Sequence, residues 1–308
     1  MIPVFYHPGY FAPIGDTHTM PMRKFALVAE QIKDHPQAEF FTPEPVTMEQ
    51  LLRVHTAEYI KAIESGEPRD KAEEQKFPWS EKLFPAVKLT NGGVVATAHK
   101  ALETGVAACL ASGFHHSHGD HGEGFCTFNG LIIALDDLLA SSKIKLGAVL
   151  DMDLHYGNGT AALAEGREHV TAISIYGNDY WLNMPYKDVD TKRHEDGENH
   201  FCDILPNGCT KEQMLSILQA NLPKILSRGK PDILIYQAGA DPYREDPYSP
   251  LLLDHDALQE RDRMVFEFCK KEGIPVAWVL AGGYTKDTSK VVKVHVNTFH
   301  ACVDVFCN

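Results

Sequence analysis

The sequence carries DMDLHYGNGT at residues 151–160, directly after an apolar run at 146–150, and this stretch decides the fold. A short apolar run that ends in polar residues and glycines is typical of a buried strand that turns into a helix. Asp151, Asp153 and His155 alternate with apolar residues, and alternate side chains of an extended chain point to the same side. The stretch therefore predicts a buried strand whose end presents two carboxylates and an imidazole together.

A similar pattern recurs along the chain. Short apolar runs alternate with longer segments that have the residue spacing of helices, as in βαβ units. Strands are expected at residues 2–6, 106–111, 146–150, 170–175, 233–236 and 276–280. Helices are expected at 20–32, 48–53, 57–64, 83–103, 129–139, 211–226, 258–271 and 291–306, with surface loops at 67–76 and 187–199. No linker, repeat or low-complexity tract divides the chain. The pattern predicts a single α/β domain over residues 1–308, with a central, largely parallel sheet flanked by helices on both faces.

Composition excludes several classes of protein. The chain has 308 residues, of which 44% are apolar and 23% charged, as in ordinary globular proteins. Its net charge of -13 argues against nucleic acid or an anionic membrane as a partner. No apolar run is long enough for a membrane span, and the first residues do not read as an export signal, so a cytoplasmic location is expected. Seven cysteines without a CxxC pair direct the search for a metal site to Asp and His.

A candidate metal site combines residues from two expected strand ends. Asp241 follows the run at 233–236, as Asp153 and His155 follow that at 146–150. In open parallel sheets, ligands bind at the carboxyl ends of the strands. One Asp after a strand is commonly a cap or turn residue, but two Asp and one His together suit a zinc site with an open coordination position.

The loop after the run at 106–111 has four histidines in the seven residues HHSHGDH at 115–121. Adjacent His115 and His116 suggest a pair of proton-transfer groups, because imidazole exchanges protons near pH 7. An adventitious metal-binding loop is the alternative. Tyr284, after two glycines at the end of the run at 276–280, suits a hydrogen-bond donor to an oxyanion.

In this order, the motifs resemble those of the zinc-dependent histone deacetylases and their bacterial relatives, the histone deacetylase-like amidohydrolases and acetylpolyamine amidohydrolases. They are VHTAEYI at 54–60, the His-His loop through GFC at 124–126, the block at 151–160, AGAD at 238–241, DP at 246–247 and GGY at 282–284. FPWS at 77–80, GEGFCTFN at 122–129 and RD at 261–262 look closest to the class IV-like bacterial branch. The resemblance implies an arginase/deacetylase-like fold over most of the chain.

The resemblance also implies two cation sites. One Zn2+ per chain would be bound by Asp153, His155 and Asp241. A structural K+ would be bound by Asp151 and Ser174 with the backbone of Asp153, His155 and Ile175. Fe2+ suits the first set of ligands as well, so the metal loaded in the cell is left open.

For catalysis, the resemblance assigns His115 and His116 as a tandem pair and Tyr284 as the oxyanion donor. Asp151 matches the aspartate that orients His115. Asn158 stands where some members have a second aspartate, beside His116. An amide adds no charge, whereas a carboxylate would raise the pKa of His116, so we expect His116 to be the neutral general base and His115 to be more protonated.

A substrate channel is implied by further matches. Gly124 and Phe125 would line it, and Gly282 would present its carbonyl near the site. Met184 stands where many members have a second channel phenylalanine, and methionine adapts to irregular partners. This suggests acyl groups longer than acetyl, although Met184 could equally be a core residue.

The expected activity is removal of acetyl and possibly longer fatty acyl groups from the lysine side-chain amine of proteins or peptides. An acetylpolyamine deacetylase is the first alternative, with an acylated polyamine as partner. A two-metal ureohydrolase and a non-catalytic reader of acyl-lysine are weaker alternatives. His118 and His121 are expected to be surface histidines of the loop, and a homo-oligomer is left open.

Overall fold

The computed structural model describes residues 1–15, 18–177 and 196–307. In this part of the chain, eight strands form one sheet in which every pairing is parallel. They are β1 (Ile2–Phe5), β2 (Ala38–Phe41), β3 (Val106–Ser112), β4 (Gly147–Asp151), β5 (Val170–Tyr176), β6 (His200–Ile204), β7 (Ile233–Ala238) and β8 (Val276–Leu280). Their order across the sheet is β2-β1-β3-β8-β7-β4-β5-β6. The predicted parallel α/β sheet is confirmed.

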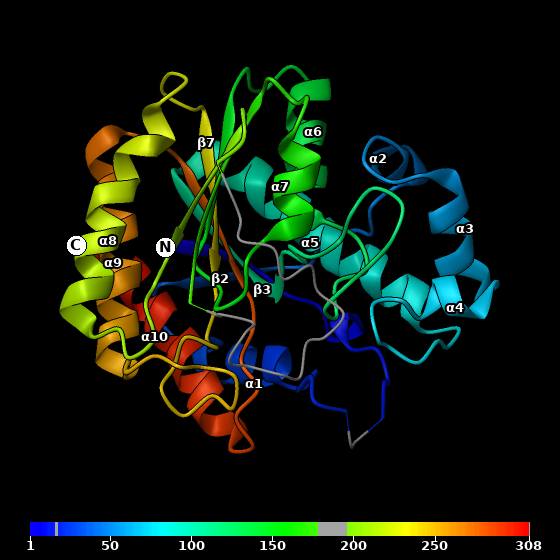
Figure 1. Cartoon of the computed structure of the whole chain (residues 1–308), viewed down its shortest axis with the longest axis horizontal. Coiled ribbons are helices and arrows are strands. Elements are labelled where there is room, and N and C mark those ends of the chain that lie inside the picture. Colours follow the sequence, from blue (N-terminus) through cyan, green and yellow to red (C-terminus); the bar gives the residue numbers. More distant parts are fainter. Residues whose placement is uncertain (16–17, 178–195, 308) are drawn as a thin grey trace.

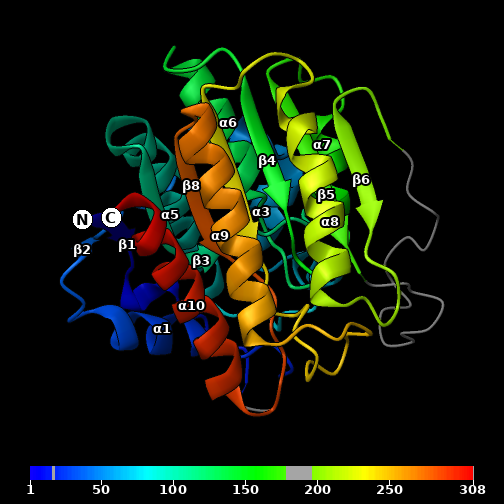
Figure 2. The ribbon, with the colours of Figure 1, turned by 90° about the vertical axis from the view of Figure 1, so that its left-hand side faces the viewer.

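Helices cover both faces of the sheet (Figure 1). They are α1 (Lys24–Ile32), α2 (Met48–Leu52), α3 (Ala57–Ser65), α4 (Arg69–Ala72), α5 (Leu83–Thr104), α6 (Gly130–Ala140), α7 (Asn158–Ala164), α8 (Lys211–Asn221), α9 (His255–Glu272) and α10 (Thr288–Phe306), with 3-10 turns η1 (Pro8–Tyr10) and η2 (Leu222–Leu226). Helices α5, α6 and α7 lie on one face, and α8, α9 and α10 lie on the other, with α1 packed against α10 (Figure 2). None of the helices in the described residues combines the length and apolar character needed to cross a lipid bilayer.

Burial explains why the central strands could be predicted from the sequence and two outer strands could not. Every residue of β3, β4, β7 and β8 is buried, because helices cover both faces of these central strands, so each is a continuous apolar run. The strands β2 and β6 were missed. They form the two edges of the sheet and are largely half-buried or exposed, so AEFF and HFCDI lack the apolar pattern of a core strand.

Two helix predictions and one loop prediction need correction. The helix predicted at 211–226 ends at Asn221 and continues as the 3-10 turn η2, in which Pro223 has no N–H for a helical hydrogen bond. Helix α1 begins at Lys24 and not at Met20, because Pro21 disfavours helical backbone before it. The stretch 67–76, predicted as a loop, contains the short helix α4.

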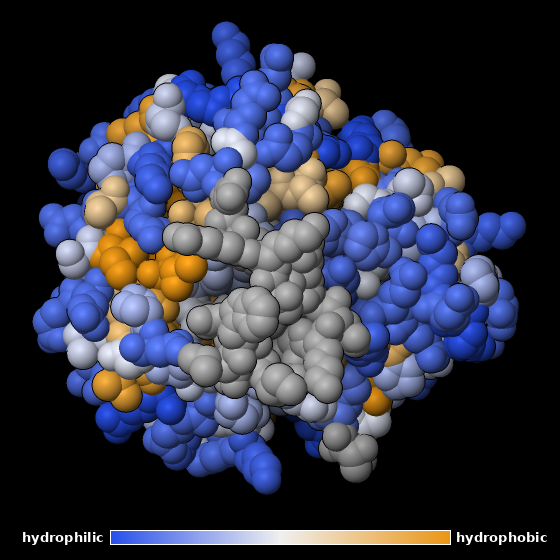
Figure 3. Space-filling model, in the orientation of Figure 1, coloured by the Kyte–Doolittle hydropathy of each residue, from blue (hydrophilic) through white to orange (hydrophobic). Residues whose placement is uncertain are grey.

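The topology gathers four loops at the carboxyl ends of the central strands. Strands β3 and β4 are consecutive in the sequence, but β8 and β7 lie between them in the sheet. The four strands are therefore adjacent in the order β3-β8-β7-β4. Because all of them are parallel, the segments after them emerge together. On the face seen in Figure 3, the coloured residues are largely hydrophilic, with scattered apolar patches. Each of the four segments carries one of the predicted site motifs.

Candidate active site

The three predicted zinc ligands lie together and are buried. Asp153 and His155 follow β4, and Asp241 follows the neighbouring strand β7. Nδ1 of His155 lies 3.1 Å from Oδ1 of Asp153 and 3.0 Å from Oδ2 of Asp241. One ligand atom from each residue lies within 4.8 Å of the others. Such close carboxylates around one imidazole form a group that could hold a metal ion.

Backbone groups fix the two carboxylates. The N–H of Gly282 donates to Oδ2 of Asp153 at 2.7 Å, and the N–H of Leu154 donates to Oδ1 of Asp241 at 3.0 Å. A Cβ on Gly282 would lie 2.0 Å from Oδ2 of Asp241, so only glycine lets the end of β8 approach this closely. The carbonyl of Gly282 accepts a hydrogen bond from the N–H of Ala240 at 3.1 Å.

The electrostatics of the group call for a cation. Burial, together with the charge of Asp153, raises the pKa of Asp241 to about 6. Burial lowers the pKa of His155, but hydrogen bonds to Asp153 and Asp241 outweigh it and raise that pKa to about 10. Two buried carboxylates need a compensating positive charge. Two carboxylates and one imidazole are ligands that Zn2+ accepts, and they leave a position open. The residues therefore fit the ion that the sequence predicts.

A pair of histidines follows β3. The Nδ1–H of His115 donates to Oδ2 of Asp151 at 2.6 Å. Nδ1 of His116 lies 2.6 Å from Oδ1 of Asn158. The two rings are 4.0 Å apart between centroids, and the ring of His116 is 5.9 Å from that of His155. The pair thus adjoins the metal-binding group, and its members have different partners.

The tautomer of His116 follows from its partner. Nδ2 of Asn158 donates to Oε2 of Glu123 at 2.7 Å, which fixes the amide with Oδ1 toward His116. An amide oxygen only accepts, so Nδ1 of His116 carries the hydrogen of this bond and Nε2 carries a lone pair. His116 is therefore built to accept a proton at Nε2.

The two rings differ in proton affinity. Burial lowers the pKa of His115, but the charges of Asp151 and Asp153 outweigh it and leave that pKa raised. Burial and the neighbouring rings of His115 and His155 hold the pKa of His116 well below its usual range. Adjacent groups with pKa values moved in opposite directions suit an acid and base pair.

Tyr284 follows β8 and faces the same site. Its N–H donates to Oδ2 of Asp246 at 2.7 Å. Its ring centroid lies 6.2 Å from that of His155 and 6.0 Å from that of Phe125. Burial and the charge of Asp241 raise the pKa of Asp246 to about 7. The backbone after β8 is thus anchored by a carboxyl group next to the metal-binding residues.

Gly124 and Phe125 form the middle of a tight turn. The N–H of Cys126 donates to the carbonyl of Glu123 at 2.7 Å, and the two central residues have φ values of +47° and +67°. A Cβ on Gly124 would lie 2.5 Å from Cδ2 of His116. The left-handed conformation of Phe125 costs about 1 kcal/mol or more. Its ring stacks on Phe77, with centroids 5.8 Å apart, and this packing holds it.

The residues predicted for K+ lie on neighbouring strands. Asp151 at the end of β4 is in register with Ser174 of β5, and Ile175 follows Ser174 in the same strand. Oγ of Ser174 accepts from the N–H of Gly157 at 3.2 Å. K+ binding stays a prediction. Met184 lies outside the described residues, so its place in the channel also stays a prediction.

Two residues of the site were missed by sequence reasoning. Lys24 is fully buried, and its Nζ donates to the carbonyl of Ala281 at 2.5 Å. Burial lowers the pKa of Lys24 to about 8. A signal existed, because Lys24 lies on the apolar stripe of its helix with Val28 and Ile32. Tyr248, whose ring is 6.2 Å from that of His155, comes from an irregular loop and gave no signal.

Comparisons with known proteins agree with this geometry. The family model described as histone deacetylase domain matches residues 18–299. An uncharacterised protein of Picosynechococcus is 32% identical over 99% of both chains. Acetylpolyamine amidohydrolase 1 of Pseudomonas aeruginosa is 26% identical over 90% of this chain and 89% of its own. The crystal structure of an acetylpolyamine aminohydrolase from Burkholderia pseudomallei has the same fold, with a TM-score of 0.79 at 20% identity over 99% of each chain. The chain is therefore a hydrolytic deacetylase that belongs to the histone deacetylase family.

Proposed function

We propose that this enzyme is a zinc-dependent amidohydrolase that removes acetyl and longer fatty acyl groups from the lysine side-chain amine of proteins or peptides. One observation carries the proposal. His115 and His116 lie 4.0 Å apart beside the Asp153–His155–Asp241 group, and one ring has a carboxylate partner while the other has an amide. This asymmetry favours protonation of His115 and leaves a lone pair on Nε2 of His116.

Asp153, His155 and Asp241 would hold the zinc ion. When bound, Zn2+ supplies a Lewis acid that polarises the scissile carbonyl and makes water more acidic. The N–H groups of Gly282 and Leu154 hold the two carboxylates in place for this task.

His116 is the general base of the proposed reaction. Its low pKa keeps the ring neutral at pH 7, and its Nε2 accepts the proton of the attacking water. The charges of Asp151 and Asp153 raise the pKa of His115, so His115 is the more readily protonated ring of the pair. The pair then returns a proton to the leaving amine, which departs as the lysine side chain.

Tyr284 donates a hydrogen bond to the oxyanion that forms when the carbonyl is attacked. One such donor is typically worth about 2.7 to 4 kcal/mol of transition-state stabilisation. Asp246 positions Tyr284 through its backbone N–H.

We further propose that K+ binds at Asp151 and Ser174, with backbone groups of Asp153, His155 and Ile175. The register of β4 with β5, which sets Asp151 beside Ser174, supports this. A cation there would favour the ionised form of Asp151, the partner of His115.

Charge beside the site favours lysine over a polyamine. The cavity next to Tyr284 has Arg23, Lys286 and Lys290 in its wall, as well as Glu245 and Asp287. Lys290 pairs with Glu245, which leaves Arg23 and Lys286 with Asp287, an excess of one positive charge among these residues. A polyamine would carry several positive charges to this wall, whereas an acylated lysine side chain is neutral.

An acetylpolyamine deacetylase remains the second candidate. The similarity to the Pseudomonas acetylpolyamine amidohydrolase favours it, and so does the net charge of -13.

The test compares substrates on the zinc-loaded enzyme. Acetyl-, octanoyl- and myristoyl-lysine peptides and acetylspermidine would be assayed in parallel, with the Asp241→Ala variant as the inactive control. We expect acyl-lysine peptides to be hydrolysed with the higher kcat/KM. A higher kcat/KM for acetylspermidine would establish the polyamine function instead. Equal rates for wild type and Asp241→Ala would refute the metal-dependent mechanism.

A further inference from the structure

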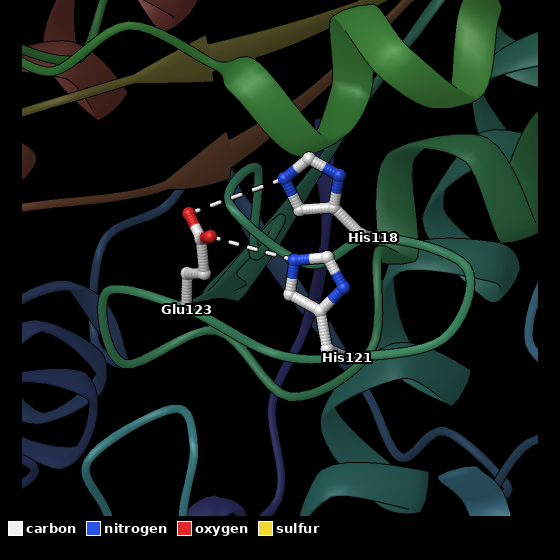
Figure 4. A group of neighbouring side chains, drawn as sticks. All are labelled: His118, His121 and Glu123. Carbon is white, nitrogen blue, oxygen red and sulfur yellow. Dashed lines mark ion pairs between the residues drawn. The ribbon is translucent and has the colours of Figure 1, made fainter. Parts of the chain in front are cut away.

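A second group of metal-binding side chains lies in the loop between β3 and α6. His118, His121 and Glu123 each offer one ligand atom, and these atoms lie within 4.8 Å of one another. Nε2 of His121 is 3.4 Å from Oε1 of Glu123, and Nε2 of His118 is 4.0 Å from Oε2. Figure 4 shows both rings turning a nitrogen toward the same carboxylate. The sequence alone indicated surface histidines of the loop here, with an adventitious metal-binding loop as the alternative.

The two imidazole rings are held in position. They stack with centroids 4.3 Å apart and an interplanar angle of 9°. The N–H of His118 donates to the carbonyl of His121 at 3.0 Å, which closes the turn between them. Nδ1 of His121 lies 2.7 Å from Oδ1 of Asp120. Histidines that ligate metals commonly have a carboxylate on the other ring nitrogen, which orients the ring.

The carboxylate of Glu123 is also fixed. Its Oε2 accepts from Nδ2 of Asn158 at 2.7 Å, while Oε1 is directed to His121. One oxygen thus anchors the side chain and the other is available to a cation. Asn158 is the residue that also contacts His116, so the loop is connected to the histidine pair of the active site.

We propose that His118, His121 and Glu123 bind a second divalent transition-metal ion, separate from the ion of the Asp153–His155–Asp241 group. Two imidazoles and one carboxylate are a ligand set that Zn2+ uses, with a further position open to water. Tetrahedral zinc with bonds of about 2.0 to 2.1 Å sets its ligand atoms about 3.3 Å apart. Nε2 of His121 and Oε1 of Glu123, 3.4 Å apart, already have this spacing. Nε2 of His118 lies 3.2 Å from Nδ2 of Asn158, so His118 would exchange this contact for the ion by a small rotation of its ring.

Exposure to solvent distinguishes the second site from the first. The side chains of His118, His121 and Glu123 are 20%, 35% and 23% exposed, whereas Asp153, His155 and Asp241 are buried. A hydrated ion can therefore reach the loop without entering the core. The second ion is expected to exchange faster and to be removed first by a chelator.

The experiment counts zinc ions per chain. The protein of residues 1–308 would be stripped with a chelator, dialysed to equilibrium against Zn2+ and subjected to elemental analysis. We expect about two ions in the wild type and about one in either His121→Ala or Glu123→Gln. Gln at 123 keeps an acceptor for Asn158, so this variant removes the charged ligand and retains the hydrogen bond. Asp241→Ala should also bind about one ion, and the Asp241→Ala/Glu123→Gln double variant none.

The control is His300→Ala. His300 is exposed and packs against His35, with ring centroids 5.7 Å apart, but these two do not belong to either metal-binding group of the described residues. Its loss should leave about two ions per chain. A decrease equal to that of His121→Ala would mean adventitious binding and would overturn the proposal.

The result that contradicts the proposal most directly is one ion per chain in wild type and Glu123→Gln alike. Circular dichroism checks that each variant is folded, and His118→Ala replaces any variant that is not. Failure of the proposed function shows elsewhere, as unchanged zinc content and activity in Asp241→Ala. The two outcomes are therefore distinguishable.

Discussion

Asn158 and His116 share a hydrogen bond of 2.6 Å, in which Nδ1–H of the ring donates to the amide oxygen. The other end of the same amide donates to Glu123, so the amide cannot turn over without losing both contacts. Position 158 therefore sets the tautomer of His116 and adds no negative charge beside the ring.

Asn158→Asp should move the pH dependence of catalysis. A carboxylate beside His116 raises the pKa of the ring, so the neutral base is reached only at higher pH. We expect the acidic limb of kcat/KM to shift upward by about one pH unit or more, measured from pH–rate profiles with zinc content checked. The Asn158→Asp/Glu123→Gln variant removes the repulsion between the two carboxylates and serves as the control. An unchanged acidic limb would mean that His116 is not the base that titrates.

Tyr284→Phe should lower turnover on the order of 100-fold or more, because one oxyanion donor is worth about 2.7 to 4 kcal/mol. Zinc content should stay the same, since Tyr284 is not among the metal-binding residues. Tyr243→Phe is the matched control, because the Tyr243 hydroxyl donates to Glu245 outside the metal-binding group. Near-normal kcat in Tyr284→Phe with full zinc would exclude the tyrosine as the oxyanion donor.

Gly282→Ala should remove the zinc ion of the Asp153–His155–Asp241 group together with activity. The added Cβ would lie 2.0 Å from Oδ2 of Asp241, so the carboxylate must leave its position. Gly119→Ala is the control, because its nearest contact would be 3.4 Å, to the carbonyl of Val54. Zinc analysis and activity at equal protein concentration test this. Retention of zinc and rate by Gly282→Ala would mean that the end of β8 can move away without disturbing the ligands.

The sequence predicts this fold and site where the constraints are local. The central strands are apolar throughout because both faces are covered, and Asp153, His155 and Asp241 stand at strand ends that a parallel sheet must bring to one edge. The edge strands β2 and β6 lack that burial, and their pairing depends on neighbours distant in the sequence.

The unpredicted contacts of the site are tertiary. Lys24 faces the carbonyl of Ala281, and Glu123 faces Asn158, across long separations in sequence. Residue type and periodicity do not encode such partners. The sequence showed that position 158 has a neutral amide where some relatives have a carboxylate. The hydrogen bond from this amide to Glu123 depends on the folded loop and could not be predicted.

Asp137 joins three helices and gives a prediction for acid stability. Its carboxylate on α6 lies 2.8 Å from Nε2 of His99 on α5, 2.9 Å from Nη1 of Arg53 and 3.0 Å from Nε2 of Gln50 on α2. The hydrogen bond from His99, with those from Gln50 and Arg53, lowers the pKa of Asp137 to about 2. In the unfolded chain this pKa is about 3.9. The ionised carboxylate therefore stabilises the fold above about pH 4, and this contribution is lost as the pH falls toward 2.

Asp137→Asn should accordingly lower the free energy of unfolding by about 1 to 2 kcal/mol at pH 7, with a smaller difference from wild type near pH 3. Urea unfolding at the two pH values measures this. Glu30→Gln, which removes the exposed ion pair with Lys33, is the control and should leave the free energy of unfolding almost unchanged at both pH values. If the difference between Asp137→Asn and wild type is the same at both pH values, the loss comes from packing or from the neutral hydrogen bonds. If the free energies of unfolding of Asp137→Asn and wild type differ less at the acidic pH, the ionised carboxylate is what holds α2, α5 and α6 together.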